Sequence, residues 1–284
     1  KGEVHTTQLS LAFGEIPRLQ KMRNLEVVLK PDVNPIWMGF NLMSSKFSDV
    51  RVRRAVAHAI NRDAIAAIVF KGLTHAENSI WLSAVKWASS PDAKIPSYDV
   101  AKANKLLDEA GFKPGPDGVR FDTKICAFRG GTLWGMPETA DFIREQLKQV
   151  GIRASVQLMD LATWQEMVNN RGDFELAIAG GMRGPDPGDF AIFVGKDGAR
   201  NAMRYENPKV EELFRRGARE SDPKKRAAIY FELQKIVAED LPLINTTQTI
   251  NPYVHRTEFT GFPWQEQFRD TGRKHFFGQV RPTK

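Results

Sequence analysis

Apolar positions along the chain alternate between helical and strand spacing. The stretch from Trp37 to Leu42 is short and apolar, which suits a buried strand. After it, apolar residues recur at helical spacing, and Asp49 is placed to cap the first turn. The pattern predicts a strand followed by an amphipathic helix. Its apolar face consists of Val52, Ala55, Val56, Ala59 and Ile60, and we expect Arg51, Arg53 and Arg54 to lie off that face.

The same alternation continues through the middle of the chain. It predicts strands over 119–128, 152–158 and 174–179, with a helix between each pair and two helices before the first. This order favours an α/β lobe with a largely parallel sheet. Ligands of such sheets usually lie near the strand ends and the loops that follow them. Residues that mark helix starts and ends are Asn61 and Gly72, Asp99 and Gly111, and Pro137 and Gly151.

The C-terminal third adds two capped helices and an extended tail. Asn207-Pro208 and Asp222-Pro223 each place a capping side chain before a proline in the first helical turn. From Thr246 to Lys284 the chain is strand-like and rich in aromatic residues.

Composition narrows the class of protein. A chain of 284 residues with 42% hydrophobic residues can bury one large core or two smaller ones. The net charge of +7 comes from Lys and Arg residues spread along the chain, which favours a solvated basic surface over a nucleic-acid interface. No apolar run is long enough to span a membrane. Cys126 is the single cysteine, so an intrachain disulfide and a cysteine-rich metal site are excluded.

Catalytic and metal-binding motifs are absent from the sequence. The five histidines show no metal-ligand spacing, and no Gly-x-Ser-x-Gly elbow or phosphate-binding loop occurs. Asp186 and Asp189 could be read as paired acids, but turn and cap roles are commoner for Asp between Pro and Gly. We therefore expect neither an enzyme nor a resident cofactor or metal.

Several long strings carry a family resemblance in the same order along the chain. They are FN at 40–41, FSDVRVRRAVAHAINRDAI at 47–65, YDVAKANKLLDEAGF at 98–112, YENPKVEELF at 205–214 and ELQKIVAEDLPLI at 232–244. Together they resemble the bacterial extracellular solute-binding proteins of family 5. These are the oligopeptide-, dipeptide-, nickel- and opine-binding components of ABC importers. The resemblance covers nearly the whole chain, which corresponds to the C-terminal half of such a protein.

The resemblance implies a fold, an organisation and a function. The fold is a periplasmic-binding-protein-like (class II) α/β lobe with a mixed, largely parallel sheet flanked by helices. Residues 1–38 would be strands of the first lobe and the hinge, 39–245 the second lobe, and 246–284 the return to the first lobe. The protein would capture a peptide-like or other small polar solute in the cleft between the lobes and deliver it to an ABC permease. It would be a periplasmic monomer that binds no nucleic acid, and the sequence would lack a signal peptide because it is truncated.

The resemblance also suggests ligand-binding residues, each with a structural alternative. Arg129 lies close to the arginine that holds a ligand carboxylate in dipeptide-binding relatives, but a solvated loop arginine is equally consistent. Trp81, in a loop, could contact ligand or simply pack. Met203 and, in the loop after the third strand, Met182 could form an adaptable wall or belong to the core.

The Pro185-Asp186-Pro187 segment points to the class of solute. Peptide-binding relatives carry an acidic residue just before this segment, where it holds the free amino group of the peptide. In this chain Arg183 stands at that position, and the usual aromatic is replaced by glycine, at Gly180 or Gly181. A guanidinium cannot accept a hydrogen bond and repels an ammonium, so we expect an anionic or neutral polar solute instead of peptides in general. The alternative is that Arg183 points to solvent or pairs with Asp186 or Asp189.

Two other classes of protein remain alternatives. A hydrolase on an α/β lobe requires a convergent nucleophile and base, which the sequence does not reveal. A nucleic-acid-binding protein requires a clustered basic face, and retention on a heparin column would distinguish it.

Overall fold

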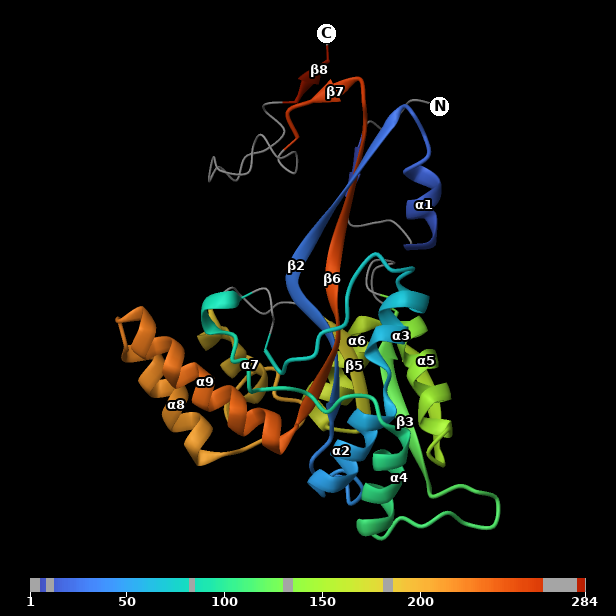
Figure 1. Cartoon of the computed structure of the whole chain (residues 1–284), viewed down its shortest axis with the longest axis vertical. Coiled ribbons are helices and arrows are strands. Elements are labelled where there is room, and N and C mark those ends of the chain that lie inside the picture. The colour runs from blue at the N-terminus through green and yellow to red at the C-terminus, as the bar shows by residue number, and fades with distance from the viewer. Residues whose placement is uncertain are drawn as a thin grey trace.

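The computed structural model describes residues 6–8, 13–81, 85–129, 135–180, 186–262 and 280–283. It is an α/β structure with one long two-stranded extension (Figure 1). In chain order the elements are β1 (Thr6–Gln8), η1 (Phe13–Glu15), α1 (Ile16–Leu19), β2 (Leu25–Phe40), α2 (Val50–Ala59), α3 (Arg62–Ala64), η2 (Ile65–Val69), η3 (Lys86–Ala88), α4 (Val100–Glu109), β3 (Phe121–Phe128), α5 (Met136–Lys148), β4 (Ile152–Met159), α6 (Leu161–Trp164), η4 (Gln165–Arg171), β5 (Leu176–Gly180), η5 (Pro187–Phe190), α7 (Ala191–Val194), α8 (Pro208–Arg219), α9 (Pro223–Asp240), β6 (Leu243–Arg256), β7 (Phe259–Thr260) and β8 (Arg281–Pro282).

The main sheet is mixed, as expected. Within the described residues its strand order is β1-β6-β2-β5-β3-β4. The three strands predicted from the alternating pattern, β3, β4 and β5, are parallel to one another. Strand β2 runs antiparallel to both β5 and β6, so the parallel part of the sheet is its β5-β3-β4 side.

Strands β2 and β6 connect the body of the molecule to its far end. They pair from Leu25 opposite Arg256 down to Gly39 opposite Leu243. The pairing register shifts between Pro31 and Pro35, where proline cannot donate to the ladder. Above the body the two strands continue as a narrow ribbon. Strand β1 pairs with β6 on this ribbon, α1 lies alongside it, and the β7–β8 pair lies at its far end (Figure 1). Part of the predicted strand-like tail, residues 263–279, lies outside the described residues.

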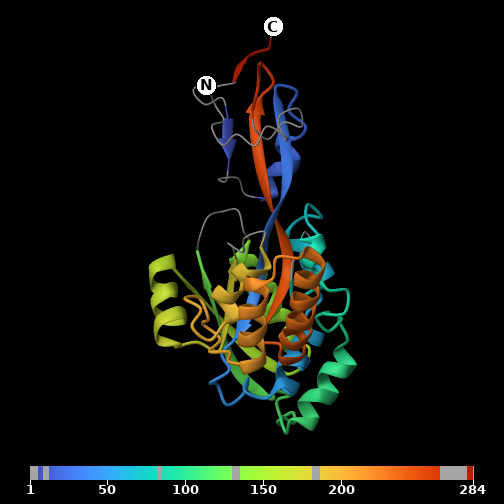
Figure 2. The same cartoon turned by 90° about the vertical axis from the view of Figure 1, so that its left-hand side faces the viewer.

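Aromatic contacts place α6 and α7 on the same face of the sheet. Phe193 of α7 packs edge-on against Trp37 of β2, and Trp164 of α6 packs against Phe128 of β3. Trp37 pairs with Ala179 of β5, and Cys126, two residues before Phe128, pairs with Ala177. Because every second residue of a strand lies on the same face, Trp37 and Phe128 share one face of the sheet. Helices α8 and α9 form a hairpin on one side of the body, and α3, α4 and α5 lie on the other (Figures 1 and 2).

Local capping chemistry sets most helix boundaries, as the sequence predicts. The side chain of each predicted cap accepts a hydrogen bond from the first turn of its helix; these caps are Asp49, Asn61, Asp99, Asn207 and Asp222. Gly151, after α5, has a φ of 77°, and a Cβ there would lie 2.7 Å from the carbonyl oxygen of Gly118. That position therefore requires glycine.

Arg53 differs from its expected position. The helical pattern predicted that it lies off the apolar face of α2, but its side chain is buried. The guanidinium donates to the carbonyls of Phe47 and Ser48 on one side, and of Asp240 and Leu241 on the other. A long side chain can reach unpaired carbonyls at a helix end that a periodicity argument does not consider.

His58 provides a test of stability against pH. Its ring is buried, and its Nδ1 donates to the carbonyl of Ser97 at 2.6 Å. Burial lowers the pKa of His58 below its ordinary value, against the opposing effect of that hydrogen bond. Stability from a neutral buried histidine is complete above the unfolded-state pKa, about 6.5, and is lost as the pH falls towards the folded-state pKa.

We therefore expect the free energy of unfolding to fall between pH 7.5 and pH 5, and to fall less in His58→Asn. The asparagine amide keeps a donor near the position of Nδ1 but does not titrate. Urea denaturation of both proteins at the two pH values measures the difference. Equal losses would assign the pH dependence to other groups, such as His255, whose pKa is also lowered by burial.

Candidate functional site

The carboxyl ends of the three parallel strands meet at one edge of the sheet. Strand β3 ends at Phe128, β4 at Met159 and β5 at Gly180. Gly180 pairs with Ile36, at the level where β2 passes from the body into the ribbon. This carboxyl edge therefore faces the β2–β6 ribbon and the elements at its far end (Figure 1). Ligand sites of α/β sheets characteristically occupy such an edge.

Arg129 lies at the carboxyl edge, where the sequence placed it. It follows β3 directly, and its backbone N–H donates to the carbonyl of Met159 at 2.8 Å. The side chain is exposed. Within the described residues its guanidinium makes no hydrogen bond or ion pair. It is thus available to an anion, and a carboxylate-binding role for it stays a prediction.

Trp81 belongs to the buried core. Its side chain is 1% exposed and packs edge-on against Phe190, with ring centroids 4.7 Å apart. The amide of Asn245 holds the preceding segment by donating to the carbonyls of Ser79 and Ile80. This is the packing alternative considered for Trp81, and a ligand contact for it stays a prediction. The indole N–H groups of Trp37 and Trp81 are buried and have no hydrogen-bond partner among the described residues.

Of the other predicted ligand-binding residues, one lies in the core and three lie outside the described residues. Met203 is fully buried, and a Cβ on Gly39 would lie 2.9 Å from its sulfur, so the thioether fills the space that this glycine leaves. Met203 thus packs in the core, and a ligand contact for it stays a prediction. Gly181, Met182 and Arg183 lie outside the described residues, and their ligand roles stay predictions.

Asp186 has the cap role that the sequence favoured. Its carboxylate accepts from the backbone N–H of Gly188 at 2.7 Å and receives two hydrogen bonds of 2.8 Å from Arg226. These bonds hold the pKa of Asp186 below its ordinary value. Arg226 also donates to the carbonyl of Gly217 and lies against the ring of Trp87. Both oxygens of Asp186 are thus engaged, and no free pair of acids results.

Sequence reasoning did not identify Arg226. It lies 40 residues from Asp186 on a helix where an arginine looks solvated. Only the fold brings it against the segment that follows β5. Helix α9 thereby holds Asp186 in place.

The described residues contain no arrangement typical of catalysis. No group of three His, Cys, Asp or Glu side chains is placed to hold a metal ion among them. Cys126 is buried, which raises the pKa of its thiol to about 11 and disfavours the nucleophilic thiolate. None of the helices in the described ranges combines the length and apolar character needed to cross a bilayer.

Comparisons with known proteins agree on one family. The model of the bacterial extracellular solute-binding proteins, family 5 (Middle), matches residues 1–201. The glutathione-binding protein GsiB of Salmonella paratyphi A is 27% identical over 268 residues, which cover 89% of this chain and 49% of that protein. GsiB of Escherichia coli K12 is 26% identical over the same shares. The chain spans about half the length of these curated relatives.

Solved structures share the fold. The periplasmic binding protein DppA from Helicobacter pylori, in complex with the peptide STSA, superposes with a TM-score of 0.83 at 24% identity. That match covers 100% of this chain and 53% of DppA. The oligopeptide-binding protein AppA from Bacillus subtilis, in complex with a nonapeptide, gives 0.83 at 21% identity, over 100% and 57% of the two chains. NikA from Staphylococcus aureus, in complex with Ni(L-His)2, gives 0.79 at 18% identity, over 91% and 54%.

Proposed function

The chain belongs to family 5 of the bacterial extracellular solute-binding proteins, and on that premise we propose that it forms the second lobe of the substrate-binding component of an ABC importer. The complete protein captures a peptide-like or other small polar solute in a cleft between two lobes and delivers it to a membrane permease, working as a monomer in the periplasm. The curated relatives are named for binding glutathione, and the solved ones hold peptides or a nickel–histidine complex.

One observation carries the two-lobe proposal. Strands β2 and β6 both continue from the body into the ribbon, where β6 also pairs with β1 (Figure 1). Two adjacent strands that cross between two bodies make a natural hinge, because small changes in their backbone angles rotate one body against the other. This supports the assignment of residues 39–245 to the second lobe, with 1–38 and 246–284 contributing to the hinge and the first lobe.

A solute-binding role replaces the enzyme alternative. Members of this family bind solutes for transporters and are not enzymes. A hydrolase would need a nucleophile with a base beside it, and the buried thiol of Cys126 does not supply one. We propose no nucleic-acid partner, in line with the dispersed basic charge, and no cofactor.

The proposal predicts that the chain alone binds its solute weakly. Affinity in a cleft arises when polar groups from both lobes contact the ligand together, and this chain supplies one side. We expect a dissociation constant at least about tenfold higher for this chain than for the complete protein, since one lost contact of about 1.4 kcal/mol has that effect. Calorimetry on both proteins with the same solute provides the comparison. Equal affinities would contradict a cleft shared by two lobes.

The class of solute follows from Arg183. A donor-only cation in place of an acid disfavours a free peptide amino terminus and favours a carboxylate, phosphate or hydroxyl-rich group. Asp186, one of the two acidic partners considered for Arg183, is paired with Arg226. We expect opines, modified amino acids, organic acids or sugars to stabilise the complete protein more than ordinary di- and tripeptides do.

A thermal-shift screen of those solutes, together with glutathione and simple peptides, tests this expectation. Arg183→Ala should lose the shift for the anionic solutes, whereas Arg171→Ala, which removes an exposed arginine before β5, should keep it. Stabilisation by ordinary peptides that persists in Arg183→Ala would refute the assignment.

A further inference from the structure

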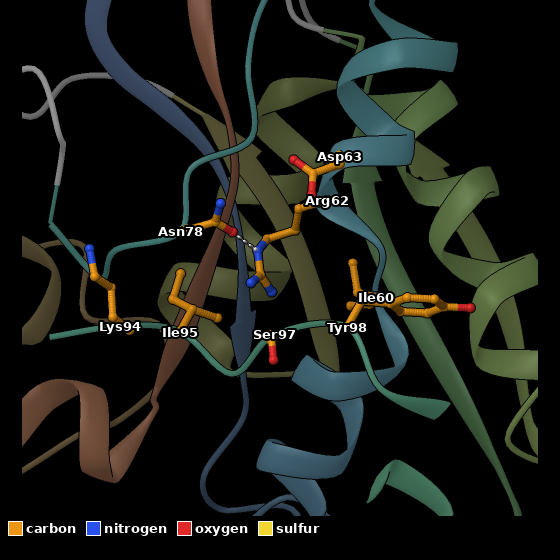
Figure 3. A pocket seen from close by; sticks show the side chains of 8 residues that line it. All are labelled: Ile60, Arg62, Asp63, Asn78, Lys94, Ile95, Ser97 and Tyr98. Carbon is orange, nitrogen blue, oxygen red and sulfur yellow. Dashed lines mark hydrogen bonds between the residues drawn. The ribbon is translucent and has the colours of Figure 1, made fainter. Parts of the chain in front are cut away.

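A pocket of about 280 Å³ opens beside α3. Its walls come from the corner between α2 and α3 and from the segment 94–98 (Figure 3). None of the residues at the ends of β3, β4 or β5 lines it. It is therefore a separate feature from the site proposed above.

The side of this pocket contains a buried cation without a counter-ion. Arg62 is 4% exposed, and no carboxylate in the described residues lies within ion-pair distance of its guanidinium. Its Nε donates to Asn78 Oδ1 at 3.1 Å and Nη2 to the carbonyl of Pro96 at 2.9 Å, while the bond from Nη1 to Ala57 is long, at 3.5 Å. A guanidinium carries five N–H donors, so two have no partner among the described residues.

The electrostatics of Arg62 are correspondingly unfavourable. Removal from water lowers its pKa to about 10, and Asp63 and Glu77 offset this only through longer-range attraction. A buried charge that lacks a counter-ion is costly, and an anion at the unused donors would reduce that cost.

Two further donors line the pocket, Ser97 beside the guanidinium and Lys94 on the far side of Ile95 (Figure 3). Lys94 and Ser97 are exposed, and neither the Lys94 ammonium nor the Ser97 hydroxyl has a hydrogen bond or ion pair among the described residues. Figure 3 shows the Arg62 guanidinium directed towards Asn78 and Ser97, while the carboxylate of Asp63 points the opposite way. The part of the pocket between Arg62 and Ser97 thus offers hydrogen-bond donors, and the carboxylate of Asp63 points away from it. The exposed ring of Tyr98 adds an apolar wall.

We propose that this pocket binds a small oxyanion, a carboxylate or a phosphate group, through Arg62, Lys94 and Ser97. Planar guanidinium donors match the oxygens of such a group, and the Lys94 ammonium on the opposite wall adds attraction for an anion. The volume accommodates a small anion and not a peptide. Because Arg62 also holds the carbonyl of Pro96, anion binding stabilises the junction between α3 and the segment that leads into α4. This site does not depend on the identity of the transported solute.

Thermal denaturation of the full chain in sodium phosphate, acetate or chloride at equal ionic strength tests the site. Phosphate and acetate should raise the melting temperature in a saturable manner and chloride should not, because a ligand that binds the folded state stabilises it by mass action. The phosphate and acetate arms distinguish the two kinds of oxyanion. Isothermal titration with inorganic phosphate gives the dissociation constant directly.

Variants at the pocket decide between specific binding and a general salt effect. Lys94→Ala and Ser97→Ala alter exposed side chains and should each weaken phosphate binding about threefold or more, as expected for loss of one charge-assisted or hydroxyl hydrogen bond. Lys113→Ala removes an exposed lysine outside the pocket and should bind as the parent does. Arg62→Lys should weaken binding further, although it also disturbs the bond to Pro96.

Two results would overturn the proposal. One is an equal melting temperature in phosphate, acetate and chloride. The other is unchanged phosphate binding in both Lys94→Ala and Ser97→Ala.

Discussion

Replacing Arg53 with methionine should lower the free energy of unfolding by about 3 kcal/mol or more, because several buried carbonyls would lose their donor at once. Arg53 donates to Phe47 at 2.7 Å, Ser48 at 2.8 Å and Leu241 at 3.1 Å, and also to Asp240. Methionine fills much of the same volume but donates nothing. Each carbonyl left unpaired away from water costs about 1–3 kcal/mol, part of which relaxation would recover.

The location of these carbonyls explains why a cation belongs there. Asp240 is the last residue of α9, and Leu241 turns the chain into β6 with a φ of 49°. The last carbonyls of a helix have no partner within the helix and carry partial negative charge. Arg53 satisfies them from α2 and so ties two helices and the start of β6 together.

Arg54 is the matched control for this prediction. It is the next residue on α2, but its side chain is exposed, and among the described residues its Nη2 donates to the carbonyl of Glu239 alone. Arg54→Met should cost less than about 1 kcal/mol, in line with other surface substitutions. Urea denaturation followed by circular dichroism measures both variants against the parent chain. Similar losses at the two positions would mean that the buried hydrogen bonds of Arg53 contribute little.

Arg53 also marks the limit of what periodicity reveals about the fold. Capping residues act on backbone groups within three positions, so Asp49, Asp99 and Asn207 could be identified from neighbouring sequence alone. The partners of Arg53 in α9 and just after it lie 187 and 188 positions away, and a helical wheel assigns a charged residue off the apolar face to solvent. Long-range hydrogen bonds of this kind become visible only when the fold is known.

The candidate site divides in the same way. A residue that follows a strand directly must lie at a strand end, so the sequence located Arg129 correctly. For Trp81 and Met203 the sequence offered two roles, a ligand wall or the core, because an apolar side chain suits both. In the structure both side chains are buried in the core. The ion pair between Arg226 and Asp186 could not be predicted, because the sequence around an arginine on an amphipathic helix does not indicate its partner.

Replacing Arg129 with alanine should weaken solute binding by the complete protein by about 2 kcal/mol or more, or roughly 30-fold, if the arginine holds an anionic group of the solute in a closed cleft. The guanidinium stands at the carboxyl edge without a partner among the described residues, so it can pair with the solute without first breaking another bond. Arginine can donate two parallel hydrogen bonds to one carboxylate, and exclusion of water on closure strengthens both.

Lys124→Ala is the matched control, since Lys124 is an exposed cation on the same strand, four residues before its end. It removes the same charge from the protein as Arg129→Ala does. Long-range attraction to an anionic solute would weaken similarly in both variants and would vanish at high salt, whereas a direct contact is lost only with Arg129. Calorimetry with the most strongly stabilising solute of the screen, at low and high salt, separates the two effects. A loss below about 0.5 kcal/mol, typical of an exposed charge pair, would make Arg129 a solvated loop residue.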